Sequence, residues 1–140
     1  MADELTTIHG SYTSIISAAS IAAGAVSAES SSIATALSAT EEIYPILDFK
    51  LLLGTTAVAD ETIDLYRRAS DGTNDAAAVT TSYLHQYCGT FTINGTTGTY
   101  YYLYGVPNQD PEDTFYLLSN CAGSETFTLY VRGRTFQPAA

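Results

Sequence analysis

Basic residues are scarce in this 140-residue chain, which has five Lys and Arg against fifteen Asp and Glu and a formal net charge of −10. A protein that binds a nucleic-acid backbone neutralises phosphates with Lys and Arg, so this balance argues against such a partner. The same shortage of bases argues against docking on an anionic membrane surface. We therefore expect neither nucleic acid nor membrane among the partners.

Charged residues of both signs make up only 14% of the chain, against about a quarter in an average globular protein. The surface must therefore be rich in Ser, Thr, Tyr, Asn and Gln, or be covered in part by a partner. Cysteine is also rare, with Cys88 and Cys121 as the only two. Two cysteines without a histidine cluster do not form a zinc site, and in a reducing compartment we expect two free thiols.

No motif in the sequence specifies a reaction. Neither G-x-G-x-x-G nor G-x-S-x-G occurs, so the sequence indicates neither a nucleotide-binding fold nor a serine-hydrolase elbow. His85 and Cys88 would point to opposite faces of a single strand, which argues against a Cys–His nucleophile pair. We therefore predict a protein that is not an enzyme, with no catalytic residues and no cofactor.

Clustered acids at 60–64 and 110–113 raise the alternatives of a carboxylate-based hydrolase and a calcium site. Residues 71–75 begin like a calcium loop, but Ala76 and Ser82 stand where such a loop needs Gly and Glu. Asp and Asn side chains that bond to their own backbone in turns explain the pattern more simply. We assign no metal ligands.

The N-terminal segment has no charged residue between positions 5 and 28 and is mostly Ala, Ser, Thr, Ile and Gly. From Thr13 to Ala39, apolar residues recur at spacings of three, four and seven, which favours one stripe of a helix. Gly24 and the many Ser residues weaken that helix, which alone would barely form in water. We expect residues 1–42 to form an arm, either helical or extended, that becomes ordered on a partner. Its predicted contact residues are Ile15, Ile16, Val26, Ile33 and Leu37.

The first residues also bear on where the protein is made. Met1-Ala-Asp-Glu lacks the positive start of a secretory signal. Residues 11–28 are too rich in Ser for a membrane span, which needs about 20 mainly apolar residues. We expect residues 1–10 to be an extended lead and the protein to be made in the cytoplasm.

From residue 43 onward, short β-rich runs alternate with turn residues. In the last run, Phe127, Leu129 and Val131 alternate with polar residues, which is typical of a strand with one buried face. The runs predict strands over residues 43–53, 62–67, 83–93, 99–106, 114–120 and 125–134. Their spacing predicts a mainly β domain over residues 43–140, built as an antiparallel β-sandwich or jelly roll.

Tyrosine is abundant, with eleven residues, and tryptophan is absent. Tyr100, Tyr102 and Tyr104 crowd one strand, and three interpretations stay open: packing between strands, a protein interface, or a sugar-binding face. Arg132 and Arg134 are natural partners for an acidic neighbour or for acids of the same chain, and arginine is common at interfaces. These three tyrosines and two arginines complete the predicted interface.

Several short strings resemble a pattern found in small structural proteins of tailed bacteriophages. Residues 64–68 (DLYRR) are followed by 70–74 (SDGTN), after an Ala/Ser-rich start. The other matching strings, in order, are 46–53 (ILDFKLLL), 89–91 (GTF), 115–120 (FYLLSN) and the strand 127–132. The chain departs from the pattern at 99–104 and 107–113. The matching motifs are structural, so the resemblance transfers no catalytic residue.

The resemblance implies a virion component located on the capsid surface. The role it favours is a cement or decoration protein, a β-sandwich that binds and stabilises neighbouring major-capsid subunits as a dimer or trimer. One alternative is a neck, tail or fibre subunit, although a fibre should show sustained heptads and Glu29 and Ser30 interrupt the stripe. Another is a carbohydrate-binding module that uses Tyr100, Tyr102 and Tyr104.

Overall fold

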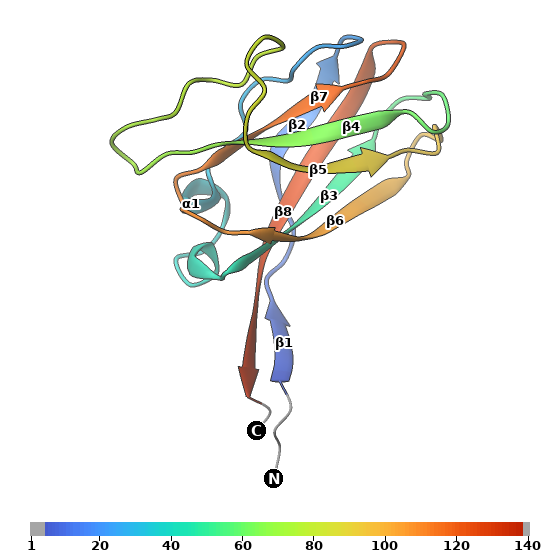
Figure 1. The fold of residues 1–140 in the computed structure, drawn as a ribbon. Helices are drawn as coiled ribbons and strands as arrows, with labels where there is room; N and C mark the ends of the chain where they lie inside the picture. Colours follow the sequence, from blue (N-terminus) through green and yellow to red (C-terminus); the bar gives the residue numbers. More distant parts are fainter. Residues whose placement is uncertain (1–4, 139–140) are drawn as a thin grey trace.

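The computed structural model describes residues 5–138, which form a mainly β protein with two antiparallel sheets (Figure 1). The larger sheet contains, in spatial order, β2 (Thr13–Ile21), β8 (Glu125–Pro138), β3 (Ile46–Leu53) and β6 (Tyr100–Pro107). Its fifth strand, β1 (Leu5–His9), pairs with the last part of β8. The smaller sheet contains β5 (Tyr87–Thr92), β4 (Thr62–Arg68) and β7 (Thr114–Ser119).

The six strands predicted from residue 43 onward are all present, with ends that differ by a few residues. Their alternation places one face of each sheet in a shared hydrophobic core. On β3, Leu47, Phe49 and Leu51 are buried in this core, whereas Asp48 and Lys50 lie on the opposite face. Phe49 meets Phe115 of the smaller sheet edge to face, with ring centroids 4.8 Å apart. Burial of such alternating apolar residues is the main stabilising contribution.

The predicted helix over residues 13–39 is wrong for most of its length. Residues 13–21 form β2, and the only helices within residues 5–138 are the single turns α1 (Ile33–Ala36) and η1 (Glu41–Ile43). The helix-like spacing has another cause. The register of β2 on β8 shifts between Ser14 and Ile16 and again before Ala19, and such bulges allow the consecutive Ile15 and Ile16 both to be buried.

The chain then crosses to the smaller sheet, where residues 24–30 run antiparallel along the free edge of β7. Ser27 and Ser30 complete the hydrogen bonding there, because their hydroxyl oxygens accept from the N–H groups of Leu117 (3.0 Å) and Phe115 (2.9 Å). Residues 13–37 are therefore built into the sheets and core instead of forming an arm that waits for a partner. Of the expected extended lead, residues 1–4 lie outside the described residues.

Beyond the body of the molecule, β1 and the end of β8 continue together as a two-stranded ribbon (Figure 1). The ribbon pairs residues 5–9 with residues 134–138. β3 ends its pairing with β8 at Arg134, so within residues 5–138 no further strand pairs with either long edge of the ribbon. We call these residues the terminal ribbon.

Candidate functional site

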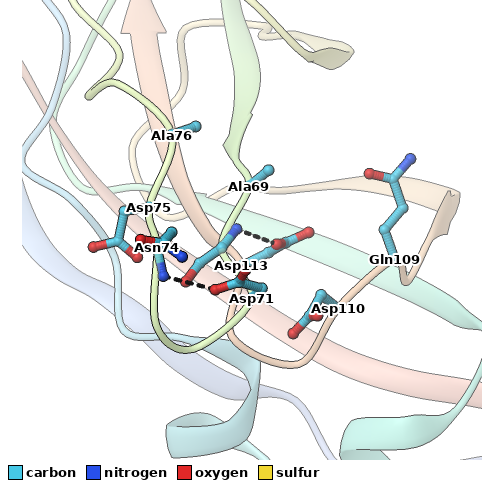
Figure 2. Close-up of a pocket in the computed structure, with 9 residues that line it drawn as sticks. Ala69, Asp71, Asn74, Asp75, Ala76, Gln109, Asp110 and Asp113 are labelled. Atoms are coloured by element: carbon cyan, nitrogen blue, oxygen red, sulfur yellow. Dashed lines mark hydrogen bonds between the residues drawn. The ribbon is translucent and has the colours of Figure 1, made fainter.

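Two acidic loops that the sequence singles out come together around a pocket of about 390 Å³ (Figure 2). Asp71 accepts hydrogen bonds from the backbone N–H groups of Thr73 (2.8 Å) and Asn74 (2.6 Å). Asp110 accepts one from the N–H of Glu112 (2.9 Å). These carboxylates stabilise their own turns, as the simpler interpretation predicts.

Asp113 connects the two acidic loops through its side chain. Its carboxylate accepts from the N–H of Ser70 (2.9 Å) and lies 3.4 Å from Nε of Arg67. Burial raises the pKa of Asp113, although the Ser70 N–H and the Arg67 charge oppose the rise. Among the residues that the structure describes, no group of three or more His, Cys, Asp or Glu is placed to hold a metal ion. The Asp71, Asp110 and Asp113 carboxylates at this pocket all accept hydrogen bonds from backbone N–H groups of the two loops.

A second feature lies on the outer face of the larger sheet. Tyr100, Tyr102 and Tyr104 of β6 are 46%, 50% and 58% exposed, whereas Tyr101 and Leu103 between them pack against the core. The rings of Tyr102 and Tyr104 stack with centroids 5.8 Å apart and an interplanar angle of 21°. Packing within the core therefore accounts for Tyr101 but not for the other three tyrosines.

Lys50, the chain's single lysine, is held at the centre of this face. Its Nζ lies 4.8, 4.8 and 4.6 Å from the ring centroids of Tyr12, Tyr100 and Tyr130. These rings come from three segments, and Lys50 pairs directly with Tyr130 of β8 and Tyr102 of β6. Cation–π attraction to several rings holds the ammonium in place and also restrains the tyrosines.

Asp48 holds the two arginines beside this cluster. Arg134 donates two hydrogen bonds to the carboxylate (2.8 and 3.0 Å), and Nε of Arg132 donates a third (3.1 Å). The N–H of Gly105, at a bulge of β6 with φ of 80°, donates a fourth (3.2 Å). Burial acts to raise the pKa of Asp48, but the bonds from Arg134, Gly105 and Arg132 outweigh it and leave the pKa below its ordinary value. Asp48 is therefore an ionised, fully buried anchor.

Tyr12 contacts both Lys50 and Arg132 on this face of the sheet. Its ring lies 4.8 Å from the guanidinium carbon of Arg132 and 6.1 Å from the ring of Tyr102. Burial raises the pKa of Tyr12 to about 12, although the Arg132 charge opposes the rise. Together these side chains form a surface that we call the tyrosine face: Tyr12, Asp48, Lys50, Tyr100, Tyr102, Tyr104, Tyr130, Arg132 and Arg134.

The predicted interface residues divide into two groups. Ile15, Ile16, Ile33 and Leu37 are buried in the protein's own core, and Val26 bridges to Leu118 of β7, so these five do not form an outward-facing surface. Helical periodicity was misleading here because a bulged strand buries neighbouring residues. The second group lies together on the tyrosine face: Tyr100, Tyr102, Tyr104, Arg132 and Arg134.

Sequence reasoning did not find Tyr12, Asp48, Lys50 or Tyr130. One signal was present: Asp48 and Lys50 are the only charged residues in the apolar run 46–53, at the spacing of two that puts them on one face of a strand. Tyr12 gives no such signal, because only the pairing of β2 with β8 brings its loop over Lys50.

No protein-family model and no curated protein matches the chain. Within residues 5–138, no helix has the length and hydropathy to cross a lipid bilayer. Among the nine residues of that face, three positive charges stand against one carboxylate, in a chain whose net charge is −10.

Proposed function

We propose that the protein is a non-enzymatic structural component of a tailed-phage virion, namely a capsid cement or decoration protein. In this proposal the tyrosine face binds neighbouring major-capsid subunits and stabilises the shell. The observation that carries the proposal is a preformed platform of exposed tyrosines with two arginines and a lysine already held in place. Tyr and Arg dominate binding hot spots, and side chains ordered before binding lose little entropy on docking.

The order of the strands supports the same proposal. If residues 24–30 are taken as a strand, the sheets read β2–β8–β3–β6 and (24–30)–β7–β4–β5. Counted along the chain from β2, these are strands 1-8-3-6 and 2-7-4-5. We infer from this order an eight-stranded β-sandwich of the jelly-roll type, with β1 as an addition before it. Jelly rolls are common in viral capsid and lectin domains.

Charge indicates the chemistry of the partner surface. The tyrosine face has an excess of positive charge, whereas the chain as a whole is strongly acidic. A capsid surface with exposed Asp and Glu would attract this face and repel the others, which fixes orientation more than it adds affinity. We therefore expect acidic groups on the shell opposite Arg132 and Arg134.

The test is binding to shells of the major capsid protein from the same phage, assembled without this protein. Replacing Tyr102 and Tyr104 together by alanine should weaken binding by about 30-fold or more, since truncated hot-spot residues typically cost at least 2 kcal/mol. The matched control replaces Tyr83 and Tyr87, two comparably exposed tyrosines outside the face, and should change binding less than twofold, about the range of neutral contacts. Equal losses in both variants would contradict the proposal.

Electron cryomicroscopy of intact particles separates capsid placement from the neck, tail or fibre alternative. We expect density for the two sheets on the shell, with the outer face of β6 against it. Density confined to the tail would contradict the cement role and leave the structural role in place.

A carbohydrate-binding module is the second candidate, favoured by the exposed and nearly parallel rings of Tyr102 and Tyr104. Aromatic side chains present large, rigid apolar surfaces with a polar tip, which suits a sugar ring. A glycan array probed with the purified protein tests this alternative. Binding that the Tyr102 and Tyr104 variant abolishes would favour the module over the capsid protein.

A further inference from the structure

A second cavity, of about 230 Å³, opens between the two sheets. Its lining comes from β4 and β5 of the smaller sheet, from the end of β6 of the larger sheet, and from the residues next to β5 and β6. Arg67 is the only charged side chain in this lining, and no Asp or Glu of the described chain takes part in it. In a protein with a net charge of −10, this cavity therefore has an unexpectedly positive wall.

Arg67 is the most buried of the four arginines, with 4% of its side chain exposed against 18–21% for the others. The other three donate hydrogen bonds to carboxylates. Within residues 5–138, the Arg67 guanidinium, which has five N–H donors, donates one hydrogen bond, to the carbonyl of Pro107. Its Nε is 3.4 Å from the Asp113 carboxylate and has no hydrogen-bond partner in the same part of the chain. Buried donors without acceptors are costly, so an acceptor in the cavity would stabilise Arg67.

Asp113 supplies charge to Arg67 from outside this cavity. Its carboxylate lines the pocket between the acidic loops, where it accepts from the N–H of Ser70 at 2.9 Å (Figure 2). The Arg67–Asp113 pair therefore connects two cavities of opposite charge. The one between the acidic loops is lined by four carboxylates, from Asp71, Asp75, Asp110 and Asp113.

Two glutamines add polar groups to the lining of the second cavity. Gln86, just before β5, has a φ of 57°, a left-handed conformation that residues other than glycine rarely adopt. Its carbonyl accepts from the backbone N–H of Arg67 at 3.0 Å, which holds Gln86 beside that residue. Gln109 follows β6, and both glutamines are exposed. Their amide N–H groups are donors that suit an anion at the mouth of the cavity.

We propose that this cavity binds a small carboxylate, with Arg67 as the charged contact and the amides of Gln86 and Gln109 at the mouth. A guanidinium presents paired N–H groups that match the two oxygens of a carboxylate. The volume of about 230 Å³ is below the range of about 300–1,000 Å³ for drug-sized ligands, so it suits an acid of a few carbons or the end of an acidic side chain.

The charge of the rest of the chain limits both the affinity and the choice of anion. A net charge of −10 and the four aspartates of the neighbouring pocket oppose any anion, and they oppose a phosphate dianion more than a carboxylate. A few-atom ligand also has little surface to bury. We therefore expect a dissociation constant in the millimolar range. This inference does not rest on the proposed function, because the cavity is separate from the tyrosine face.

The first test is a titration of the full chain with acetate at constant ionic strength, followed by nuclear magnetic resonance of the arginine Nε–H groups. The Arg67 signal should shift and saturate, while the signals of the other three arginines should stay nearly constant. Acetamide has the shape of acetate without its charge. It should bind about tenfold more weakly or less, because it loses the charge-assisted hydrogen bonds.

Cys88 gives a second readout, because it lines the cavity whereas Cys121 is only 3% exposed. Methyl methanethiosulfonate is a small neutral reagent that should modify Cys88 first. Saturating acetate should slow this reaction about fivefold or more by occupying the space beside the thiol, and acetamide at the same concentration should not.

Variants at the mouth of the cavity avoid replacing the buried Arg67. Gln109→Glu places a carboxylate at the mouth and should raise the dissociation constant for acetate about fivefold or more, because like charges repel. Gln137→Glu is the matched control, since it makes the same change at an exposed position of the terminal ribbon. Salt screens that distant charge, so the control should change binding less than about twofold. Circular dichroism of both variants should match that of the unmodified protein.

Three results would each overturn the proposal. They are an Arg67 signal that does not shift up to about 100 mM acetate, where a millimolar site would be filled, equal binding of acetate and acetamide, and equal weakening by the two glutamate variants. Blocked glutamate, N-acetylglutamate methylamide, identifies the source of the carboxylate. Tighter binding than acetate would assign the cavity to an acidic side chain of another protein, and weaker binding would assign it to a free organic acid.

Discussion

Asp48 determines how the positive side chains of the tyrosine face are arranged. A carboxylate that is fully buried loses its hydration, and this loss is offset only if its partners are close and well oriented. Arg134 binds in the two-pronged geometry that suits a guanidinium, and Arg132 and Gly105 satisfy the remaining acceptor positions. The two guanidinium groups are therefore fixed before any partner arrives.

Replacing Asp48 by Asn should lower the free energy of unfolding by about 3 kcal/mol at pH 7, because it leaves two arginines without their counter-charge. Urea unfolding measures this. Asp75→Asn is the matched control, since Asp75 is mostly exposed and 4.0 Å from Arg68, and it should cost less than about 0.5 kcal/mol.

The Asp48→Asn variant also tests whether Asp48 causes the pH dependence of the protein's stability. The pKa of folded Asp48 lies below the ordinary value of 3.8, so its stabilising contribution is present above that value and is lost as the pH falls through the folded-state pKa. Stability of the unmodified protein should therefore fall more steeply than that of Asp48→Asn below about pH 4. Parallel pH profiles would contradict this assignment.

At the scale of elements, residues 24–30 show how an Ala- and Ser-rich segment covers a sheet edge. The backbone of Ser27 donates to the carbonyl of Leu117 (2.8 Å), and the hydroxyl of the same serine accepts from the N–H of Leu117 (3.0 Å). Ser30 repeats this arrangement with Phe115. A serine every third residue thus replaces part of a regular ladder and leaves β7 without an open edge.

Replacing Ser27 and Ser30 together by alanine should destabilise the protein by about 2–5 kcal/mol, because two buried N–H groups of β7 lose their acceptors. Chemical denaturation gives the energy, and amide exchange at Leu117 and Phe115 should accelerate. Ser31→Ala, at an exposed position in the same segment, should stay within about 0.5 kcal/mol of the unmodified protein. A similar loss in that control would mean that the hydroxyl bonds are not the cause.

At the scale of the whole molecule, the N-terminal residues have two different roles. β1 belongs only to the terminal ribbon, whereas β2 covers one side of β8 and contributes Ile15, Ile16 and Ile21 to the core. Each buried isoleucine contributes about 1.5–3 kcal/mol of hydrophobic stabilisation. This sum is comparable with the whole stability of a small domain.

Deletion of residues 1–10 should therefore leave a protein that unfolds cooperatively, within about 2 kcal/mol of the full chain, because only the ribbon is lost. Deletion of residues 1–21 should abolish the cooperative transition, because it removes three core isoleucines and opens the side of β8. Thermal melts followed by circular dichroism distinguish the two. If the longer deletion still melts cooperatively, residues 13–21 are a detachable arm after all.

Much of the β architecture could be predicted from the sequence, because core residues recur at every second position in β3, β4 and β8. Such a repeat depends only on residues that are close together in the sequence. The exposure of the tyrosines could not be predicted. Tyr101 and Tyr102 are identical neighbours, yet the hydroxyl of Tyr101 donates to Asn94 in the loop before β6, while the ring of Tyr102 lies on the outer face. Which side of β6 meets the core depends on its pairing with β3, whose residues lie 48 to 61 positions earlier in the chain.

The sequence by itself determined the strands from residue 43 onward, the acid-free N-terminal segment and the turn-forming role of Asp71, because each depends on side chains a few positions apart. Tertiary structure decided that residues 13–21 form a strand, since the open side of β8 supplies hydrogen-bond partners that an isolated segment lacks. It also gathered Tyr12, Lys50, Tyr100 and Tyr130 on one face. Contacts between residues so far apart arise only from the pairing of whole strands, and no local pattern encodes them.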